Sequence, residues 1–144
     1  MEDIHYYETT VDWKSGRIGE ISAPGFNNVE VATPPEFKNG VAGIWSPEHL
    51  FVASANICLM TTFLAIAENS KVEFKSYTSK AVGKLEKVDG KFMMSEIELF
   101  PRVVVPAGAD IERVKRIVEK AEANCLISNS MKTQIKLNIE IITE

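Results

Sequence analysis

The first part of the chain alternates polar and apolar positions, and a long apolar run follows it. Residues 4–13, 17–21 and 29–32 mix β-branched and aromatic residues with polar ones, which is typical of strands. Lys14, Ser15 and Gly16 predict a turn between the first two segments, so we expect a hairpin with Arg17 just past its turn. Residues 34–44 contain two prolines and two glycines and are predicted to form a loop.

The clearest helix signal begins at Ser46. Serine is a good N-cap, Pro47 suits the first helical position, and the Glu48 carboxylate favours the positive end of a helix dipole. Residues 50–67 then continue almost without charge and are apolar on all sides of a helix. We therefore expect a long helix that is buried on most sides and forms the core of the fold.

The remaining chain predicts a long hairpin, a second helix and a last strand. Residues 72–88 and 91–105 are rich in strand-forming residues, and Asp89-Gly90 between them suits a tight turn. The second helix is amphipathic, and residues 134–141 alternate as a half-buried strand does. This order of elements predicts an α+β fold, with residues 1–144 as a single domain. The apolar stripe of the second helix consists of Ile111, Val114, Val118, Ala121 and Cys125.

Composition and charge narrow the class of protein. With 45% apolar and 25% charged residues, the chain is typical of a soluble globular protein. A net charge of -4 and the lack of a Lys/Arg cluster argue against binding to nucleic acid. The polar, acidic start does not resemble a secretory signal, and we expect no stretch that approaches the roughly 18 apolar residues of a membrane span. These features predict a cytoplasmic location without a membrane partner.

The two cysteines, Cys58 and Cys125, each fall in a predicted helix on its apolar side. In a reducing compartment both would rest as thiols, so a disulfide between them would be transient and functional. A buried cysteine taken singly is more often core filler. A pair allows peroxide chemistry, in which one thiolate attacks the O–O bond and the second thiol condenses with the resulting sulfenic acid. An arginine such as Arg17 would lower the thiol pKa and hold the peroxide oxygens.

Three segments together resemble the OsmC/Ohr family of thiol-dependent peroxidases. They are residues 46–51 with the following Cys58, residues 123–130 around Cys125, and residues 15–19 around Arg17. The resemblance spans nearly the whole chain. It implies an OsmC-like fold, with antiparallel sheets and a long buried central helix in an intertwined homodimer whose active sites lie at the subunit interface.

The resemblance also implies a role for each candidate residue. Cys58 would be the peroxidatic cysteine and Cys125 the resolving cysteine, while Arg17 would activate the thiolate and Glu48 would orient Arg17. The substrates would be organic hydroperoxides, reduced to alcohols without a cofactor or metal, and dithiols such as dihydrolipoyl groups would recycle the enzyme. The alternative is a non-enzymatic member of the same fold that binds a small apolar ligand or serves a stress response. A disulfide-relay or acyl-carrying protein is less favoured, because the chain has no Cys-x-x-Cys motif.

Helix geometry limits how Glu48 can serve Cys58. Ten residues separate them, and at about 1.5 Å of rise per residue a straight helix would hold them roughly 15 Å apart. Either the helix breaks near its start, or Glu48 serves a cysteine of the partner subunit. A metal site is not expected, because His5 and His49 are the only histidines and have no ligand-like spacing.

Overall fold

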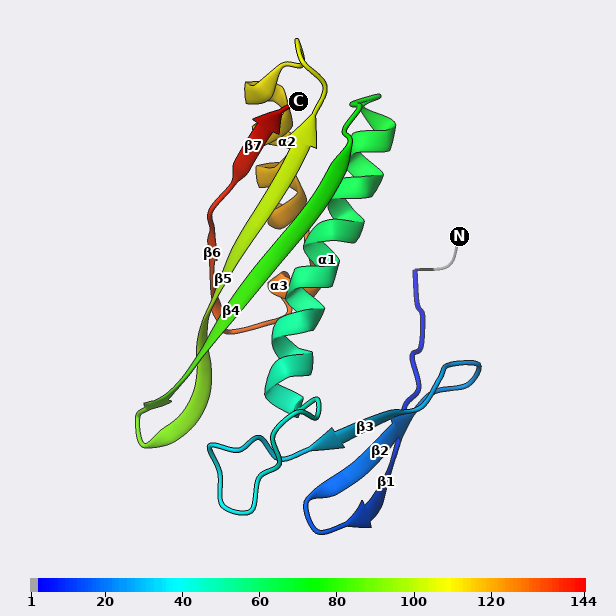
Figure 1. Ribbon diagram of the computed structural model, residues 1–144, viewed down its shortest axis with the longest axis vertical. Helices are drawn as coiled ribbons and strands as arrows, with labels where there is room; N and C mark the ends of the chain where they lie inside the picture. The colour runs from blue at the N-terminus through cyan, green and yellow to red at the C-terminus, as the bar shows by residue number, and fades with distance from the viewer. Residues whose placement is uncertain (1–2) are drawn as a thin grey trace. The chain divides into compact units, whose positions relative to one another are not determined.

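The computed structural model describes residues 3–144 and combines sheets with helices, which confirms the α+β class (Figure 1). The chain divides into two compact units, residues 1–50 and residues 51–144. The first unit contains a sheet and the loop that precedes the long helix. The second contains the larger sheet, most of the long helix and both cysteines. The expectation of one domain over residues 1–144 stays a prediction.

The first unit is built on a three-stranded antiparallel sheet in the order β1-β2-β3. The predicted first strand started too early, because Thr10 pairs with Ser22 at the end of β2 and residues 4–9 have no strand opposite them. The turn includes the predicted Gly16, which has a positive φ of 52°, but Lys14 and Ser15 belong to β1 and Arg17 lies in the turn rather than just past it. The strands are β1 (Thr10–Ser15), β2 (Ile18–Ser22) and β3 (Val29–Ala32).

Helix α1 (Pro47–Asn69) begins where the sequence predicts. Its N-cap is Ser46, which is fully buried and whose Oγ accepts a hydrogen bond of 3.1 Å from the backbone N–H of His49. Ser46 Oγ also lies 2.7 Å from His49 Nδ1. The helix runs without a break, so the alternative in which it breaks near its start is wrong.

The sheet of the second unit is arranged around one central strand. Strand β4 (Ser76–Val88) pairs antiparallel with β5 (Lys91–Val105) through the predicted Asp89-Gly90 turn, where φ is 51° and 80°. The last predicted strand is in fact two short strands, β6 (Gln134–Leu137) and β7 (Glu140–Thr143), which pair parallel with β5 one after the other. Asn138 interrupts them, and its backbone N–H donates to Leu99 O at 2.8 Å.

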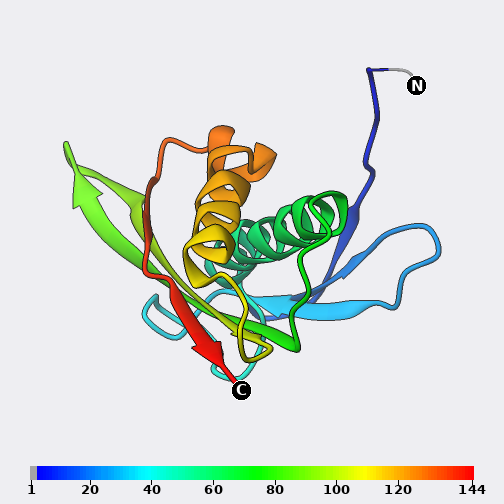
Figure 2. The ribbon, with the colours of Figure 1, turned by 90° about the horizontal axis from the view of Figure 1, so that it is seen from above.

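The core of the second unit lies between this sheet and the helices α1 and α2 (Ile111–Ala123), which cover one face of it (Figures 1 and 2). From α1 it takes Leu59 and Phe63, and the Phe63 ring stacks on Tyr77 of β4 with centroids 5.1 Å apart. Gly83 lets α1 approach β4 closely, because a Cβ at that position would lie 2.4 Å from Val52 Cγ2.

Cys125 does not lie inside the second helix, contrary to the prediction. Helix α2 ends at Ala123, where the backbone and the side chain of Asn124 both donate to Lys120 O. Cys125 then adopts an extended backbone conformation before the short helix α3 (Leu126–Asn129). The apolar stripe of the sequence continues through this interruption because Cys125 stays fully buried.

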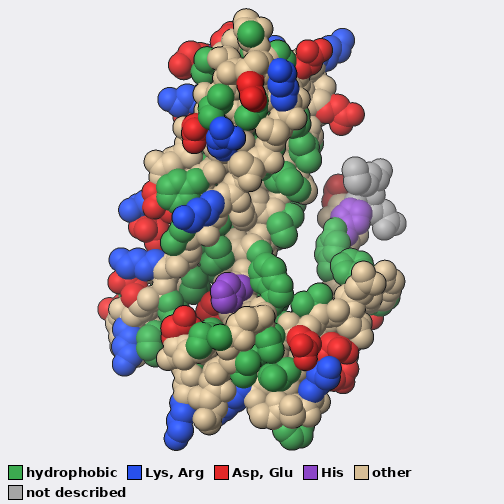
Figure 3. Space-filling model, in the orientation of Figure 1, with side chains coloured by type: hydrophobic (Ala, Val, Ile, Leu, Met, Phe, Trp, Pro, Cys, Tyr) green, Lys and Arg blue, Asp and Glu red, His purple; other side chains and the backbone are tan. Residues whose placement is uncertain are grey.

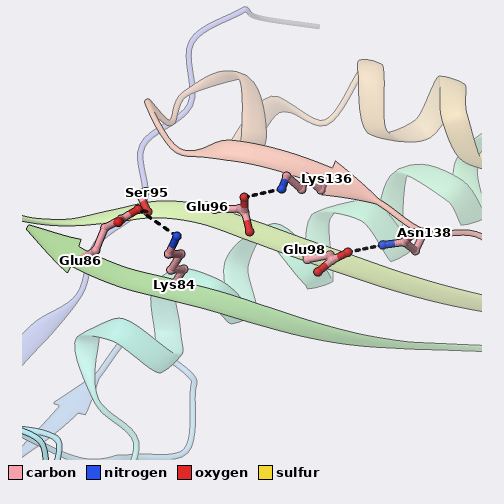
Figure 4. A network of polar contacts seen from close by, with 7 residues as sticks. All are labelled: Lys84, Glu86, Ser95, Glu96, Glu98, Lys136 and Asn138. Carbon is pink, nitrogen blue, oxygen red and sulfur yellow. Dashed lines mark hydrogen bonds and ion pairs between the residues drawn. The ribbon is translucent and has the colours of Figure 1, made fainter. Parts of the chain in front are cut away.

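The outer face of the larger sheet carries a network of polar side chains (Figure 4). Lys136 Nζ lies 2.8 Å from Glu96 Oε1, and this contact raises the pKa of the lysine. A hydrogen bond from Ser95 lowers the pKa of Glu86, and Lys84 lowers it further. The exposed charges mark this face as the solvent side of the sheet. The network is completed by Glu98 and Asn138.

Helix α1 corrects the expectation that no segment approaches a membrane span. Over its 23 residues it is long and apolar enough to cross a membrane by length and composition alone. Core helices of soluble proteins meet the same criterion. Here Ala55, Leu59 and Phe63 of α1 are fully buried in the core of the second unit. Only Cys58 and Ala67 are buried besides them, so the expectation that this helix is buried on most sides is wrong for the single chain.

Candidate active site

The two cysteines meet inside the second unit. Cys58 projects from α1 and is 8% exposed, whereas Cys125, between α2 and α3, is fully buried. Both are free thiols, and Cys58 lies near enough to Cys125 to raise the pKa of the Cys125 thiol. The fold therefore juxtaposes two thiols that are 67 positions apart in the sequence, which is what a transient disulfide requires.

The surroundings of Cys125 favour its protonated form. Burial is the main cause that raises the pKa of this thiol, and the neighbouring Cys58 raises it further, while Ser128 lowers it. Cys125 therefore rests as a neutral thiol at neutral pH. Since only a thiolate is a good nucleophile, Cys125 must lose a proton before or as it attacks another sulfur.

Two threonines that follow Cys58 in α1 lie next to it. Cys58 Sγ lies 3.9 Å from Thr62 Oγ1, one turn further along. Thr61 Oγ1 donates to Cys58 O at 3.1 Å. The Thr62 hydroxyl thus gives the sulfur a polar neighbour on an otherwise apolar helix.

Sequence reasoning missed a polar group that lies next to Cys125. Ser128 is buried and its Oγ has no hydrogen-bond partner among the described residues, but it lies near enough to Cys125 and Glu122 to lower the pKa of both groups. Burial raises the pKa of Glu122. Burial is also the main reason why the pKa of Tyr77 is raised to about 12, and the negative charge of Glu122 adds to this shift. Helical periodicity could not have indicated this group, because α2 ends before Cys125.

Arg17 and Glu48 lie together in the first unit. Both line a cavity of about 670 Å³, whose wall also includes Trp13, Ile18 and Phe37. Glu48 Oε1 is buried and accepts no hydrogen bond from any residue in the described part of the chain. The cavity therefore combines an exposed guanidinium and a buried carboxylate oxygen with a largely apolar wall.

The four predicted site residues thus form two pairs, one in each unit. The cysteines lie near each other, and Arg17 and Glu48 line the same cavity. Their catalytic roles stay predictions. Within residues 3–144, no group of three or more His, Cys, Asp or Glu side chains is placed to hold a metal ion.

Comparison with known proteins places the chain in a family. The family model described as OsmC-like protein matches residues 40–140, which include Glu48 and both cysteines but not Arg17. Peroxiredoxin OsmC of Escherichia coli is 29% identical over 139 residues, or 96% of this chain and 90% of the relative. The uncharacterized protein YmaD of Bacillus subtilis is 24% identical over 143 residues, or 97% and 95% of the two chains.

Solved structures show the same fold. An OsmC-like protein of unknown function from Vibrio cholerae has a TM-score of 0.87 at 26% identity, covering 94% of this chain and 99% of its own. An organic hydroperoxide resistance protein from Elizabethkingia anophelis has a TM-score of 0.78 at 23% identity, with both chains covered completely. Because the family model covers more than half of the sequence and the fold agrees, the chain belongs to the OsmC/Ohr family of OsmC-like proteins.

Proposed function

We propose that this protein is a thiol peroxidase that reduces organic hydroperoxides to alcohols. The observation that carries the proposal is the proximity of two free cysteines from separate elements within an OsmC-type fold. The name of the E. coli relative, peroxiredoxin, and that of the Elizabethkingia structure, organic hydroperoxide resistance protein, support the same chemistry.

In the first step, the Cys58 thiolate attacks one oxygen of the hydroperoxide. A sulfur–oxygen bond forms as the O–O bond breaks, which leaves Cys58 as a sulfenic acid and releases an alkoxide that takes up a proton to become the alcohol. Arg17, oriented by Glu48, would stabilise the thiolate and the charge on the leaving oxygen. The apolar wall of the cavity beside Arg17 suits an alkyl or aryl substituent on the peroxide.

In the second step, Cys125 attacks the sulfenic acid to form a Cys58–Cys125 disulfide and water. A dithiol such as a dihydrolipoyl group then reduces this disulfide by exchange. The proximity of the two thiols supports this step. A reducing, cytoplasmic location fits a resting state in which both thiols are free.

The active form is proposed to be a homodimer with its sites at the subunit interface. Only Ala55, Cys58, Leu59, Phe63 and Ala67 of α1 are buried, although the helix is apolar on all sides. Ile57 remains 56% exposed and Leu64 39% exposed. Hydrophobic side chains accordingly reach the surface along the α1 side of the second unit (Figure 3). With α1 unbroken, the remaining alternative for Glu48 is that it serves a cysteine of the partner subunit.

The proposal is tested by adding one equivalent of cumene hydroperoxide to the reduced protein and mapping its thiols by mass spectrometry. We expect loss of both free thiols and formation of a Cys58–Cys125 disulfide. Cys58→Ser should consume no peroxide. Its matched control, Cys125→Ser, should consume one equivalent and then stop with a sulfenic acid that dimedone traps. If peroxide leaves both thiols free in the wild type, the non-enzymatic alternative replaces this proposal.

A further inference from the structure

The Cys58 sulfur lies within reach of a hydroxyl on its own helix. Cys58 Sγ is 3.9 Å from Thr62 Oγ1, a distance at which the large sulfur atom still forms a weak hydrogen bond. Because α1 runs unbroken from Pro47 to Asn69, residues 58 and 62 are neighbours one turn apart on the same face of the helix. Within residues 3–144, the sulfur is the only hydrogen-bond partner of the Thr62 hydroxyl.

The adjacent threonine has a different arrangement, although its side chain is the same. Thr61 Oγ1 donates to the backbone carbonyl of Cys58 at 3.1 Å, which is a common local bond for a threonine inside a helix. Thr61 is exposed, whereas Thr62 is half-buried. Of the two hydroxyls, only that of Thr62 is therefore directed at the atom that reacts.

Helix α1 gives a charged sulfur little other help. Cys58 lies near the middle of the helix, and the helix dipole acts mainly within the first and last turns. The helix contains no lysine or arginine. Cys58 is only 8% exposed, so little water reaches it to solvate a negative charge. The Thr62 hydroxyl is consequently the group by which α1 itself stabilises a thiolate at this position.

We propose that Thr62 is a catalytic residue of the first step, whose hydroxyl donates a hydrogen bond to the Cys58 thiolate and keeps it ionised. This inference rests on the proposed peroxidase function and adds a residue to that site. In the neutral thiol, either atom of the pair can be the donor. Once the sulfur has lost its proton, the hydroxyl must donate, and a hydrogen bond to a charged acceptor is roughly twice as strong as one to a neutral acceptor. The contact therefore favours the thiolate over the thiol.

The step balances in atoms and electrons while Thr62 keeps its own proton. A lone pair of the thiolate forms the sulfur–oxygen bond, and the electron pair of the O–O bond leaves with the alkoxide, which takes a proton from solvent. Cys58 is oxidised to a sulfenic acid and the hydroperoxide is reduced to the alcohol. A better stabilised thiolate is also less nucleophilic, with a Brønsted coefficient of about 0.4–0.5. About a tenfold loss of thiolate should therefore slow the reaction only about threefold.

The experiment isolates the first step in the full-length protein with Cys125→Ser as the parent. This change also removes the Cys125 thiol, the titratable group that lies near Cys58 in the described part of the chain. Stopped-flow kinetics follow oxidation by cumene hydroperoxide, and alkylation by iodoacetamide reports the thiolate without any peroxide. At pH 7 we expect Thr62→Val, which keeps the shape of the side chain, to lower both rate constants about threefold. Thr62→Ser, which keeps the hydroxyl, should recover most of the loss.

The matched control is Thr61→Val, which removes the same group one position earlier. Its rate constants should equal those of the parent, because the Thr61 hydroxyl bonds to a carbonyl and not to the sulfur. A loss in Thr61→Val as large as that in Thr62→Val would overturn the assignment to Thr62.

A second pH distinguishes stabilisation of the thiolate from packing. At pH 10 the sulfur is ionised with or without the hydroxyl, so the deficit of Thr62→Val should vanish or reverse. An equal deficit at both pH values would overturn the proposal, and so would a parental rate for Thr62→Val at pH 7. If the wild type consumes no peroxide, the proposed function fails. The alkylation rates then still decide whether Thr62 stabilises the Cys58 thiolate.

Discussion

Arg17 carries the charge on which the proposed first step depends. Replacing it by alanine removes the guanidinium from the cavity that it shares with Glu48. We expect the second-order rate constant for Cys58 oxidation by cumene hydroperoxide to fall about 100-fold, as is typical when a donor that stabilises developing charge is lost. Stopped-flow kinetics provide the measurement. Lys14→Ala is the matched control, because Lys14 lies on the same hairpin with its ammonium 3.5 Å from Glu20. A wild-type rate in Arg17→Ala would contradict its role.

Because the pKa of Tyr77 is raised in the folded protein, we expect the protein to lose stability at alkaline pH. An unfolded tyrosine ionises near its usual pKa of 10.0, whereas burial raises the pKa of Tyr77 to about 12. Above pH 10 the unfolded state therefore loses the proton first, so the free energy of unfolding falls as pH rises from 10 towards 12. The side chain is partly exposed, and we expect this contribution to be about 1 kcal/mol at pH 11 after solvent screening.

The measurement compares urea unfolding at pH 9 and pH 11 for the wild type and Tyr77→Phe. The phenylalanine variant should lose less stability between these two pH values, because it has no phenol to ionise at position 77. Tyr6→Phe is the control, since Tyr6 is 92% exposed. An identical loss in the wild type and Tyr77→Phe would show that this phenol titrates normally.

At the level of elements, the packing of α1 on β4 depends on the absence of a side chain at position 83. A Cβ there would lie 2.4 Å from Val52 Cγ2 and 2.7 Å from Met94 Cε. The methionine end can move, but the valine is held on the helix. We expect Gly83→Ala to lower the free energy of unfolding by about 1–3 kcal/mol, measured by urea denaturation.

Val52→Ala removes the clashing methyl groups and supplies the control for Gly83→Ala. In the double variant the added methyl group should occupy space left by the removed ones. The loss in free energy of unfolding should therefore be less than the sum of the losses in the two single variants. Additive costs would mean that the helix and the strand adjust independently. Such a result would contradict the close contact on which the argument depends.

The sequence predicts most elements of this fold because local signals and tertiary contacts agree for them. Ser46 caps α1 with the predicted hydrogen bond, and Asp89-Gly90 makes the predicted turn with positive φ at both positions. The first strand and the last strand were predicted less well. The first strand is limited by its partner strand, which ends at Ser22, and the last strand is interrupted at Asn138. Periodicity along one segment does not contain that information.

For the candidate site, too, some features could be predicted from the sequence and others could not. The structure brings the two cysteines named from motifs, Cys58 and Cys125, near each other, and this proximity depends on long-range packing that composition does not reveal. The break between α2 and α3 at Cys125 was hidden because the apolar stripe continues across it. Glu122 is one of several acidic residues on the amphipathic second helix, and its partial burial is not evident from the sequence.

For the whole molecule, the surface of α1 argues for a second subunit. The helix combines a core-facing side with exposed Ile57 and Leu64, and a solvent-facing helix normally carries polar residues at such positions. A second copy of the chain that covers these side chains would remove them from water. It would also provide a Glu48 that is not constrained by the roughly 15 Å of helix between this residue and Cys58 in one chain.

If the active form is the proposed dimer, an isolated, folded monomer should be a poor peroxidase. Ile57→Asp places a charge in the apolar surface of α1 and should shift the protein to monomers in sedimentation velocity, with circular dichroism unchanged. Its peroxidase activity per chain should fall at least about tenfold, because each site would lose the group that the partner provides. Ile111→Asp is the matched control, since Ile111 is 41% exposed at the start of α2, next to charged residues. A monomer that stays fully active, whether produced by Ile57→Asp or by dilution of the wild type, would show that one chain completes the site alone.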